Sequence, residues 1–307
     1  MRRSEKNPIL TRADIEGRDV SSVFNPGAVR HRGRDLLLLR VQTRGRETLW
    51  MVAEGRDGSF RVRPEPVRLD LPAGVHHAYD PRLTAIGDTV YAVFAADTDE
   101  GCRLGIARTM DFERFDLVGL DAAGDRRNGV LFPERFEGHY LRLERPNVVQ
   151  PAGGPPTGSE IVLARSEDLV TWEPVGPVME GRPRRWDEII GSGPPPLKTR
   201  AGWLHLYHGV ATHFASNHIY QAGVVLLDRK DPQRVLGRSR ENILEPREPY
   251  ELTGQVPNVV FPSGWIADEC DADGYAPPRS RVDVYYGAAD TVVGLATTTV
   301  QELLDAL

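Results

Sequence analysis

Cysteine is scarce in this sequence, and several other signals are missing. Two cysteines, Cys102 and Cys270, occur among 307 residues, too few for a disulfide framework and without the spacing of a zinc site. No stretch approaches the ~20 apolar residues that a membrane span needs, and no apolar run follows the basic N-terminus to form a signal peptide. We therefore expect a cytoplasmic protein that has no membrane contact and binds no metal.

The charge balance also excludes a class of partner. The formal net charge is −6, and no block of basic residues interrupts the chain. A nucleic-acid surface needs a basic patch, so no nucleic-acid partner is expected. Arginine is nevertheless abundant, and any site for a small anion should be a pocket that gathers arginines locally.

Helical periodicity is nearly absent, whereas turn residues are frequent. The chain has 30 glycines and 24 prolines, which is typical of a protein with many strands and turns. The clearest candidate for a helix is the C-terminal stretch 299–307, where Thr299 could cap the first turn and Glu302 would complete a capping box.

A repeated pattern runs through the whole chain. Ala107-Arg108-Thr109 is echoed by Ala164-Arg165-Ser166. Related copies bring the repeat to five, at residues 49–58, 105–115, 161–172, 222–231 and 293–299. An alternating apolar stretch typical of a half-buried antiparallel strand precedes each copy, at residues 35–40, 89–94, 138–143, 202–208 and 282–287.

Most of these units also begin with proline. The proposed starts are Asn25-Pro26, Asp80-Pro81-Arg82, Arg145-Pro146-Asn147, Gly193-Pro194-Pro195 and Pro257-Asn258 to Pro262. A period of roughly 50 to 65 residues, with about four strands each, is typical of a β-propeller blade. We therefore predict an all-β, five-bladed β-propeller with a short C-terminal helix, in which residues 1–307 form a single catalytic domain and the five starts converge on the central channel.

Asp80 is the candidate catalytic acid. Because it directly precedes Pro81, we expect extended backbone geometry at the start of a strand, with the side chain held in one direction. An Asp-Pro pair is also an ordinary way to begin a turn, and this stretch alone favours that interpretation. The surrounding pattern shifts the balance toward catalysis.

The propeller geometry brings further polar residues to the axis. They are Asn25, Arg40, Arg82, Arg145, Arg165, His208 and Asp290. Inverting glycoside hydrolysis normally needs two carboxylates. Phosphorolysis needs one acid, because phosphate is itself the nucleophile and can be held by arginine and histidine. Taken singly, Arg145 could be a solvated strand end, His208 a core histidine and Asp290 a turn residue.

With these residues in view, the chain resembles glycoside hydrolase family 130, the inverting β-mannoside phosphorylases and their hydrolytic relatives. The resemblance covers nearly the whole length. The motifs that carry it are Phe24-Asn25-Pro26-Gly27-Ala28, Asp80-Pro81-Arg82, 128–134, Glu144-Arg145-Pro146, 166–172, 191–196, Tyr207-His208-Gly209 and Gly287-Ala288-Ala289-Asp290. They are weak singly and specific in this order.

The resemblance implies a five-bladed propeller and assigns roles to residues. Asp80 would be the general acid, passing its proton through the mannose 3-hydroxyl to the glycosidic oxygen. Phosphate would be bound by Arg40, Arg145, Arg165 and His208. The sugar in the cleaved subsite would be held by Asn25 and Asp290, with Tyr79 and Arg82 as neighbours. The family often forms oligomers, so a homo-oligomer is implied by analogy.

The sequence departs from the family at two positions. Ile189 stands where members often carry a lysine, and Arg127 stands where lysine is common. The first departure removes a cation from near the expected pocket. Glu188 is the acid that could serve as the base if water replaced phosphate.

The expected activity is phosphorolysis of a β-mannoside at its non-reducing end, giving α-mannose 1-phosphate. Inorganic phosphate is the co-substrate, and no metal or organic cofactor is called for. The alternatives are an inverting β-mannosidase that uses water and a second carboxylate and, from another class, a carbohydrate-binding propeller without catalysis.

Overall fold

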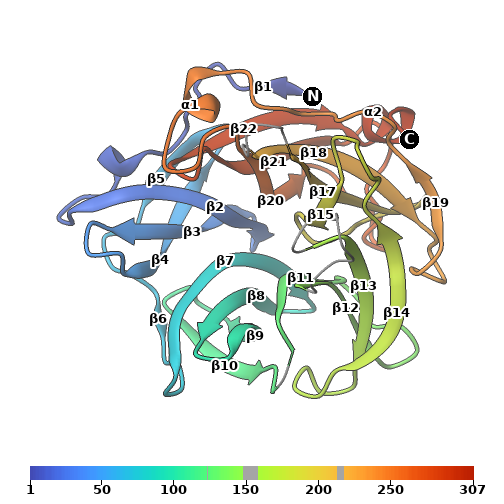
Figure 1. Cartoon of the computed structure of the whole chain (residues 1–307), viewed down its shortest axis with the longest axis horizontal. Helices are drawn as coiled ribbons and strands as arrows, with labels where there is room; N and C mark the ends of the chain where they lie inside the picture. Colours follow the sequence, from blue (N-terminus) through green and yellow to red (C-terminus); the bar gives the residue numbers. More distant parts are fainter. Residues whose placement is uncertain (123, 148–157, 213–217) are drawn as a thin grey trace.

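In the computed structural model, five antiparallel sheets surround a central axis (Figure 1). The structure describes residues 1–122, 124–147, 158–212 and 218–307. Each sheet is one blade, and the chain visits the blades in sequence order. The predicted five-bladed β-propeller is confirmed.

Within each blade, the strands lie in the following order, from the innermost, next to the axis, to the outermost. Blade one consists of β2 (Val20–His31), β3 (Arg34–Thr43), β4 (Thr48–Arg56) and β5 (Ser59–Val62). Blade two consists of β7 (Val75–Ile86), β8 (Thr89–Thr98), β9 (Gly101–Thr109) and β10 (Arg114–Leu120), with β6 (Arg68–Leu69) parallel to β10. Blade three consists of β11 (Arg126–Leu131), β12 (Tyr140–Pro146), β13 (Glu160–Ser166) and β14 (Glu173–Glu180).

The last two blades depart slightly from this plan. In blade four the innermost strand is split, so that β15 (Ile189–Ser192) and β16 (Leu197–Thr199) both pair with β17 (Gly202–Thr212), followed by β18 (His218–Leu227) and β19 (Val235–Arg238). Blade five consists of β20 (Val260–Ala267), β21 (Arg281–Ala288), β22 (Val292–Thr299) and β1 (Arg2–Arg3).

The N-terminal strand closes the ring. β1 pairs antiparallel with β22, so the beginning of the chain supplies the outermost strand of the last blade. Arg3 donates from Nε and Nη2 to the two carboxylate oxygens of the buried Glu251, each over 2.8 Å. Glu251 belongs to helix α1 (Pro249–Leu252), and it also accepts a hydrogen bond from Tyr286 of β21. This buried ion pair holds the closing strand in place.

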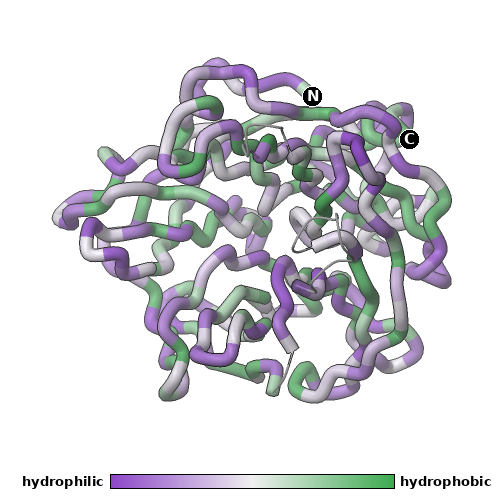
Figure 2. Tube along the Cα trace, viewed as in Figure 1, coloured by the Kyte–Doolittle hydropathy of each residue, from purple (hydrophilic) through white to green (hydrophobic). Residues whose placement is uncertain are grey.

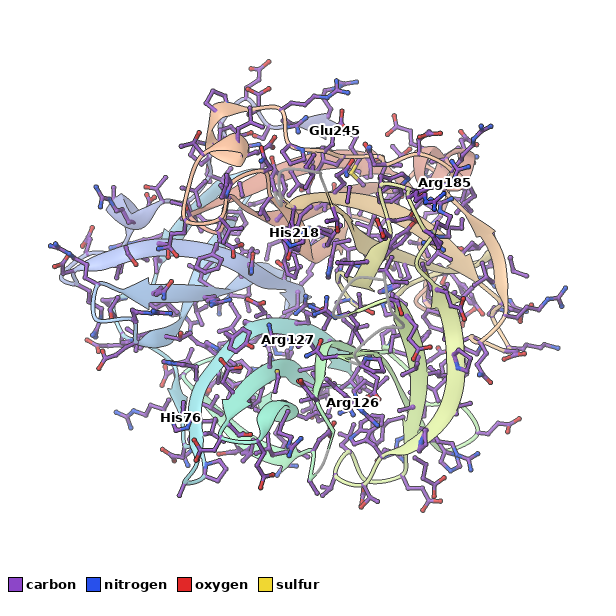
Figure 3. All side chains as sticks on the ribbon, in the orientation of Figure 1. His76, Arg126, Arg127, Arg185, His218 and Glu245 are labelled. Carbon is purple, nitrogen blue, oxygen red and sulfur yellow. The ribbon has the colours of Figure 1, made fainter. Side chains whose placement is uncertain are left out.

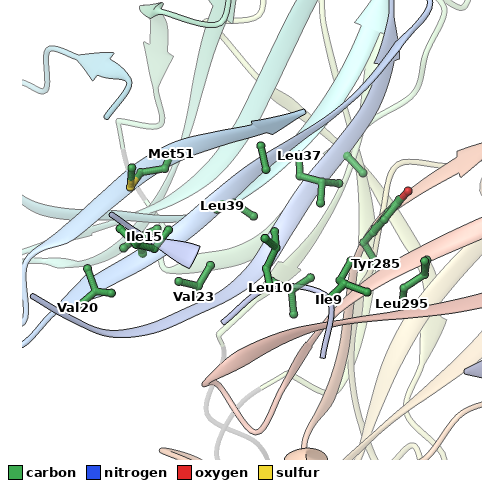
Figure 4. Close-up of a cluster of buried hydrophobic side chains, with 14 of the residues drawn as sticks. Ile9, Leu10, Ile15, Val20, Val23, Leu37, Leu39, Met51, Tyr285 and Leu295 are labelled. Carbon is green, nitrogen blue, oxygen red and sulfur yellow. The ribbon is translucent and has the colours of Figure 1, made fainter. Parts of the chain in front are cut away.

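The hydrophobic core lies between neighbouring blades. At the contact of blades one and five, Leu37 and Leu39 of β3 share a cluster with Tyr285 and Leu295, and the N-terminal segment adds Leu10 (Figure 4). Leu36 and Leu38 of the same strand belong to the cluster between blades one and two, so both faces of β3 are apolar. Figure 2 shows hydrophobic and hydrophilic stretches mixed around the whole ring. Alternating side chains point to opposite faces of a sheet, which lets each blade pack against both neighbours.

The repeats of the sequence correspond to equivalent strands. The five related copies form the third strands, β4, β9, β13, β18 and β22, and the alternating stretches before them form the second strands, β3, β8, β12, β17 and β21. The C-terminal helix is also as predicted. α2 spans Val300–Asp305, Thr299 is its N-cap, and Thr299 and Glu302 form the capping box.

One of the five predicted starts is wrong. Arg145-Pro146 ends β12, the second strand of blade three, and the innermost strand of that blade is β11, which contains Asn128 and no proline. The proline pattern failed there because the innermost strand of blade three has its register shift at Asn128-Gly129, where blades one and two have Asn25-Pro26 and Asp80-Pro81.

The 3-10 helix η1 (Arg12–Asp14) completes the regular elements. Among the residues that the structure describes, no helix has the length and apolar character needed to span a membrane.

Candidate active site

A pocket of about 370 Å³ lies at the centre of the ring, and every blade contributes to it. The pocket is lined by one polar residue or more from each blade: Asn25 from blade one, Asp80 from blade two, Asn128 from blade three, His208 from blade four and, just after β21 of blade five, Asp290. Residues far apart in the sequence thus share one cavity, as the convergence of the innermost strands predicts.

In three of the innermost strands, the polar residue that lines the pocket lies in a β-bulge. Asn25, Asp80 and Asn128 have positive φ angles of 46°, 53° and 54°. Each lies where the register of its strand shifts against the second strand of the blade. Such a bulge redirects a side chain, and Asn and Asp are the non-glycine residues that best tolerate this conformation.

The expected backbone of Asp80 is therefore wrong. β7 begins at Val75, so Asp80 lies inside the strand, and its φ of 53° is left-handed rather than extended. The general preference of a residue before proline is outweighed by the bulge between Tyr79 and Arg82.

The carboxylate of Asp80 is surrounded by donors. Asn25 Nδ2 and Arg40 Nη1 both donate to Oδ1 of Asp80 over 2.9 Å. Arg82 is buried, and it donates to the backbone carbonyl oxygens of Asp80 over 2.8 Å and of Gly193 over 2.9 Å. Burial alone would raise the pKa of Asp80, but the charges of Arg40 and Arg82 and the two hydrogen bonds lower it below its usual value. Asp80 is therefore a carboxylate in this state.

The second carboxyl group of the pocket behaves in the opposite way. Asp290 follows β21 with a φ of 48°. Burial and the negative charge of Asp80 raise the pKa of Asp290 to about 7, although Arg40 acts against this shift. The pocket thus contains two carboxyl groups whose surroundings separate their pKa values, an arrangement that distinguishes acid from base roles in many enzymes.

A cluster of cations lines another part of the pocket. Arg127 of β11 and Arg145 of β12 are directly opposite each other in the ladder. Arg145 Nη2 donates to Asn147 Oδ1 over 3.2 Å, and its buried Nε has no hydrogen-bond partner among the described residues. Burial and the charge of Arg127 lower the pKa of Arg145 to about 10.

His208 of β17 lies in the same pocket. It is fully buried, and its ring is 4.6 Å from that of Phe261. Burial and the charge of Arg145 lower the pKa of His208 well below its usual value, so the imidazole is neutral near pH 7. Within the described ranges, neither ring nitrogen makes a well-formed hydrogen bond. A neutral imidazole can still donate one hydrogen bond to an anion.

Arg40 lies next to the acid and between two aromatic rings. Its guanidinium lies 4.5 Å from the centre of the Phe24 ring and 4.7 Å from that of Tyr79. The hydrogen bond to Asp80 occupies Nη1. The hydroxyl of Tyr79 donates to Asp97 over 2.7 Å. Arg40 therefore lines the pocket beside the acid.

Two predicted residues do not reach the pocket. Arg165 lies on β13, the third strand of its blade, where its exposed side chain pairs with Glu173 at 3.0 Å. The prediction that it shares the site is wrong, because the third strand is separated from the axis by two others. Glu188 is half-buried just before β15 and does not line the cavity. The position of Glu188 therefore does not support a role as the base.

Other pocket residues were missed by the sequence reasoning. In the sequence, Arg127 stands out only as a departure from the family pattern, and Asn128 only as part of a motif. The Asn-Gly pair resembles Asn25-Pro26, so Asn128 could have been recognised as the missing start of blade three. Tyr220 and Asp97 also line the pocket, and no sequence signal pointed to either. Among the described residues, no group of three or more His, Cys, Asp or Glu side chains could hold a metal ion.

Comparisons with known proteins identify the family. The sequence model of glycoside hydrolase family 130, described as beta-1,4-mannooligosaccharide phosphorylase, matches residues 1–307. The beta-1,4-mannooligosaccharide phosphorylase of Ruminococcus albus is 30% identical over 99% of this chain and 89% of its own length. The 4-O-beta-D-mannosyl-D-glucose phosphorylase of Bacteroides fragilis is 32% identical over 98% of this chain and 78% of its own.

A solved structure agrees with these relatives. The beta-1,2-mannobiose phosphorylase from Listeria innocua, in complex with beta-1,2-mannobiose, superimposes with a TM-score of 0.84 at 28% identity, covering 100% of this chain and 98% of that one. The resemblance inferred from the motifs is thus confirmed over the full length, and the chain belongs to glycoside hydrolase family 130.

Proposed function

We propose that this protein is an inverting glycoside phosphorylase. It removes a β-mannosyl residue from the non-reducing end of a short oligosaccharide, uses inorganic phosphate as the co-substrate, and releases α-mannose 1-phosphate. The observation that carries the proposal is the pair Arg127 and Arg145, which face each other in the same pocket as Asp80. The relatives named above are phosphorylases of mannosides, which supports the same reaction.

The phosphate site in this proposal consists of Arg127, Arg145 and His208. Two facing arginines repel each other unless an anion lies between them, and guanidinium groups bind phosphate oxygens through charge-assisted hydrogen bonds. Among the residues that the structure describes, Arg145 Nε has no hydrogen-bond partner, so it and the imidazole of His208 can donate to such an anion. Arg127, and not the exposed Arg165, supplies the second arginine of this site.

The cleaved mannosyl residue occupies the part of the pocket near Asn25, Tyr79 and Asp290. Asn25 and Asp290 offer hydrogen-bonding groups for sugar hydroxyls, and the Tyr79 ring helps to shape this wall. We assign Arg82 a supporting role, because its hydrogen bonds go to backbone carbonyl oxygens and hold the bulge of Asp80.

The reaction then proceeds in one displacement. An oxygen of hydrogen phosphate attacks the anomeric carbon while the bond from that carbon to the leaving oxygen breaks on the opposite face. The leaving oxygen receives a proton from Asp80, directly or through a sugar hydroxyl. The proton of hydrogen phosphate then passes to Asp80 and restores its protonated form. Because cations lower the pKa of Asp80, its proton has to arrive with the substrates or from Asp290, which retains a proton near pH 7.

This scheme needs no metal or organic cofactor, because the arginine side chains supply the positive charge that phosphate requires. We further propose that residues 1–307 act as one catalytic domain in the cytoplasm. Whether the protein forms a homo-oligomer is testable by light scattering of the purified chain.

The decisive experiment measures mannose 1-phosphate released from β-1,4-mannobiose, β-1,2-mannobiose and mannosyl-glucose, each with and without phosphate. We expect turnover of at least one of these sugars to depend on phosphate, with α-mannose 1-phosphate as the product. Equal rates of cleavage in both conditions, with free mannose as the product, would instead identify a mannosidase.

A further inference from the structure

The strand pair β11 and β12 has two faces of opposite character. On the face toward the pocket, Arg127 is opposite Arg145. Successive side chains of a strand alternate, so the preceding residues, Arg126 and Glu144, lie on the other face. There, Arg126 donates to Oε1 of Glu144. In Figure 3, Arg127 lies nearer the centre of the ring than Arg126.

Glu144 is the centre of a buried ionic network behind the pocket. Its exposed fraction is 1%, and its Oε2 accepts a hydrogen bond from Arg142 Nε over 2.9 Å. Arg142 is completely buried, and it also donates to both carboxylate oxygens of Asp121 over 3.1 and 2.7 Å. Its guanidinium lies 4.1 Å from the centre of the Trp172 ring. Every atom of the Glu144 carboxylate is thus fixed.

The pairing of β11 with β12 is interrupted next to the two pocket arginines. Arg127 pairs with Arg145, but the register then shifts, and the next pair is Val130 with Leu143. The bulge removes regular backbone hydrogen bonds beside Arg127. The repulsion between the facing guanidinium groups acts on the same segment. The contact from Arg126 to Glu144 joins the two strands across this interruption.

We propose that Glu144 is a positioning residue, which holds Arg127 and Arg145 at the spacing that binds phosphate. The residue touches neither substrate. It acts by fixing the backbone of both strands from behind, through Arg126 on β11 and through its own place next to Arg145 on β12. This inference rests on the proposed phosphorolysis and adds to it the structure that prepares the phosphate site. A site held before binding needs less reorganisation when the ligand arrives.

The test uses Glu144→Gln, which keeps the shape of the side chain and removes its charge. We expect the KM for phosphate to rise about tenfold, while the KM for the mannoside changes less than twofold. The matched control is Asp35→Asn. Asp35 is also a buried carboxylate paired with arginines, Arg30 and Arg56, but it lies outside the lining of the pocket.

A purely structural role predicts a different result. It lowers the amount of folded enzyme in both variants and leaves both KM values unchanged. If Glu144→Gln does not fold, Arg126→Met decides, because Arg126 is partly exposed and its replacement removes only one contact of the network. We expect this variant to raise the KM for phosphate about threefold and to weaken the rise in Tm that phosphate produces.

The possible outcomes separate this inference from the proposed function. An unchanged KM for phosphate in Arg126→Met and in any folded Glu144→Gln, with a phosphate-dependent wild type, overturns the role of Glu144 and leaves the phosphorylase intact. A wild type that cleaves mannosides equally well without phosphate overturns both.

Discussion

Arg40 Nη1 donates a hydrogen bond to Asp80 Oδ1 over 2.9 Å, and Asn25 Nδ2 donates to the same oxygen over the same distance. This pairing makes Arg40 part of the environment of the acid, while its binding of phosphate stays a prediction. The negative charge of the pocket therefore lies on Asp80, because its pKa is lowered, whereas the pKa of Asp290 is raised to about 7. The ordinary description of a general acid with a raised pKa thus fits Asp290 better than Asp80 before substrates bind.

The first prediction concerns the acid itself. Asp80→Asn should lower kcat by about 10²- to 10⁴-fold, because the leaving oxygen loses its proton donor. Affinity for the mannoside should persist, since the amide fills the same space between Asn25 and Arg40. Release of mannose 1-phosphate and calorimetric binding of the sugar measure the two effects. A variant with activity within a few-fold of the wild type would assign the proton transfer to another group.

The second prediction compares two arginines of the same blade. Arg145→Ala should reduce kcat/KM for phosphate about 10- to 150-fold, because a charge-assisted hydrogen bond contributes about 1.5–3 kcal/mol. Arg165→Ala serves as the control and should leave all kinetic constants unchanged, since Arg165 is exposed and pairs with Glu173. Phosphate titrations at saturating mannoside test both variants. Equal effects of the two substitutions would contradict the assignment of the site.

The third prediction follows from the raised pKa of Asp290. The unfolded chain releases this proton near the ordinary pKa of an aspartate, about 4, whereas the folded protein keeps it up to about 7. Between these values the folded state binds more protons, so this group makes stability fall as the pH rises from about 4 to 7.

Replacing Asp290 with Asn should remove this contribution. Urea unfolding of both proteins at several pH values measures the difference in free energy of unfolding, which should increase in favour of Asp290→Asn as the pH rises toward 7. A difference independent of pH would show that Asp290 is already ionised.

The fourth prediction concerns ring closure. Glu251→Gln should lower the free energy of unfolding by about 3 kcal/mol, because it removes the charge that pairs with Arg3 inside the structure. Although burial acts in the opposite direction, the hydrogen bonds from Arg3 and from backbone amides lower the pKa of Glu251. Its stabilisation is therefore present at neutral pH and lost as the pH falls through that lowered pKa.

A charge-matched control is available in the same region. Glu5→Gln changes an exposed carboxylate near the N-terminus and should alter stability by less than about 0.5 kcal/mol. Urea unfolding of both variants at neutral pH measures the difference. If the two variants are equally stable, the ion pair does not secure the closing strand.

The amino-acid sequence by itself determined the blade number, the equivalent strands and the capped helix. These features are local or periodic: alternation of period two marks a strand, five related copies mark five blades, and Thr299 with Glu302 marks a helix start. Asp80 was also found from its neighbours in the chain, although its left-handed backbone was not.

Only the tertiary structure decided which cations share the pocket. Arg165 and Arg145 lie in similar strand patterns, yet one is on the third strand of blade three and the other on the second. The choice of Arg127 over Arg165 depends on the register of β11 against β12, where Arg127 is opposite Arg145. A shift of one residue would turn these side chains to the other face. Register results from the packing of whole blades, and no short stretch of sequence contains it.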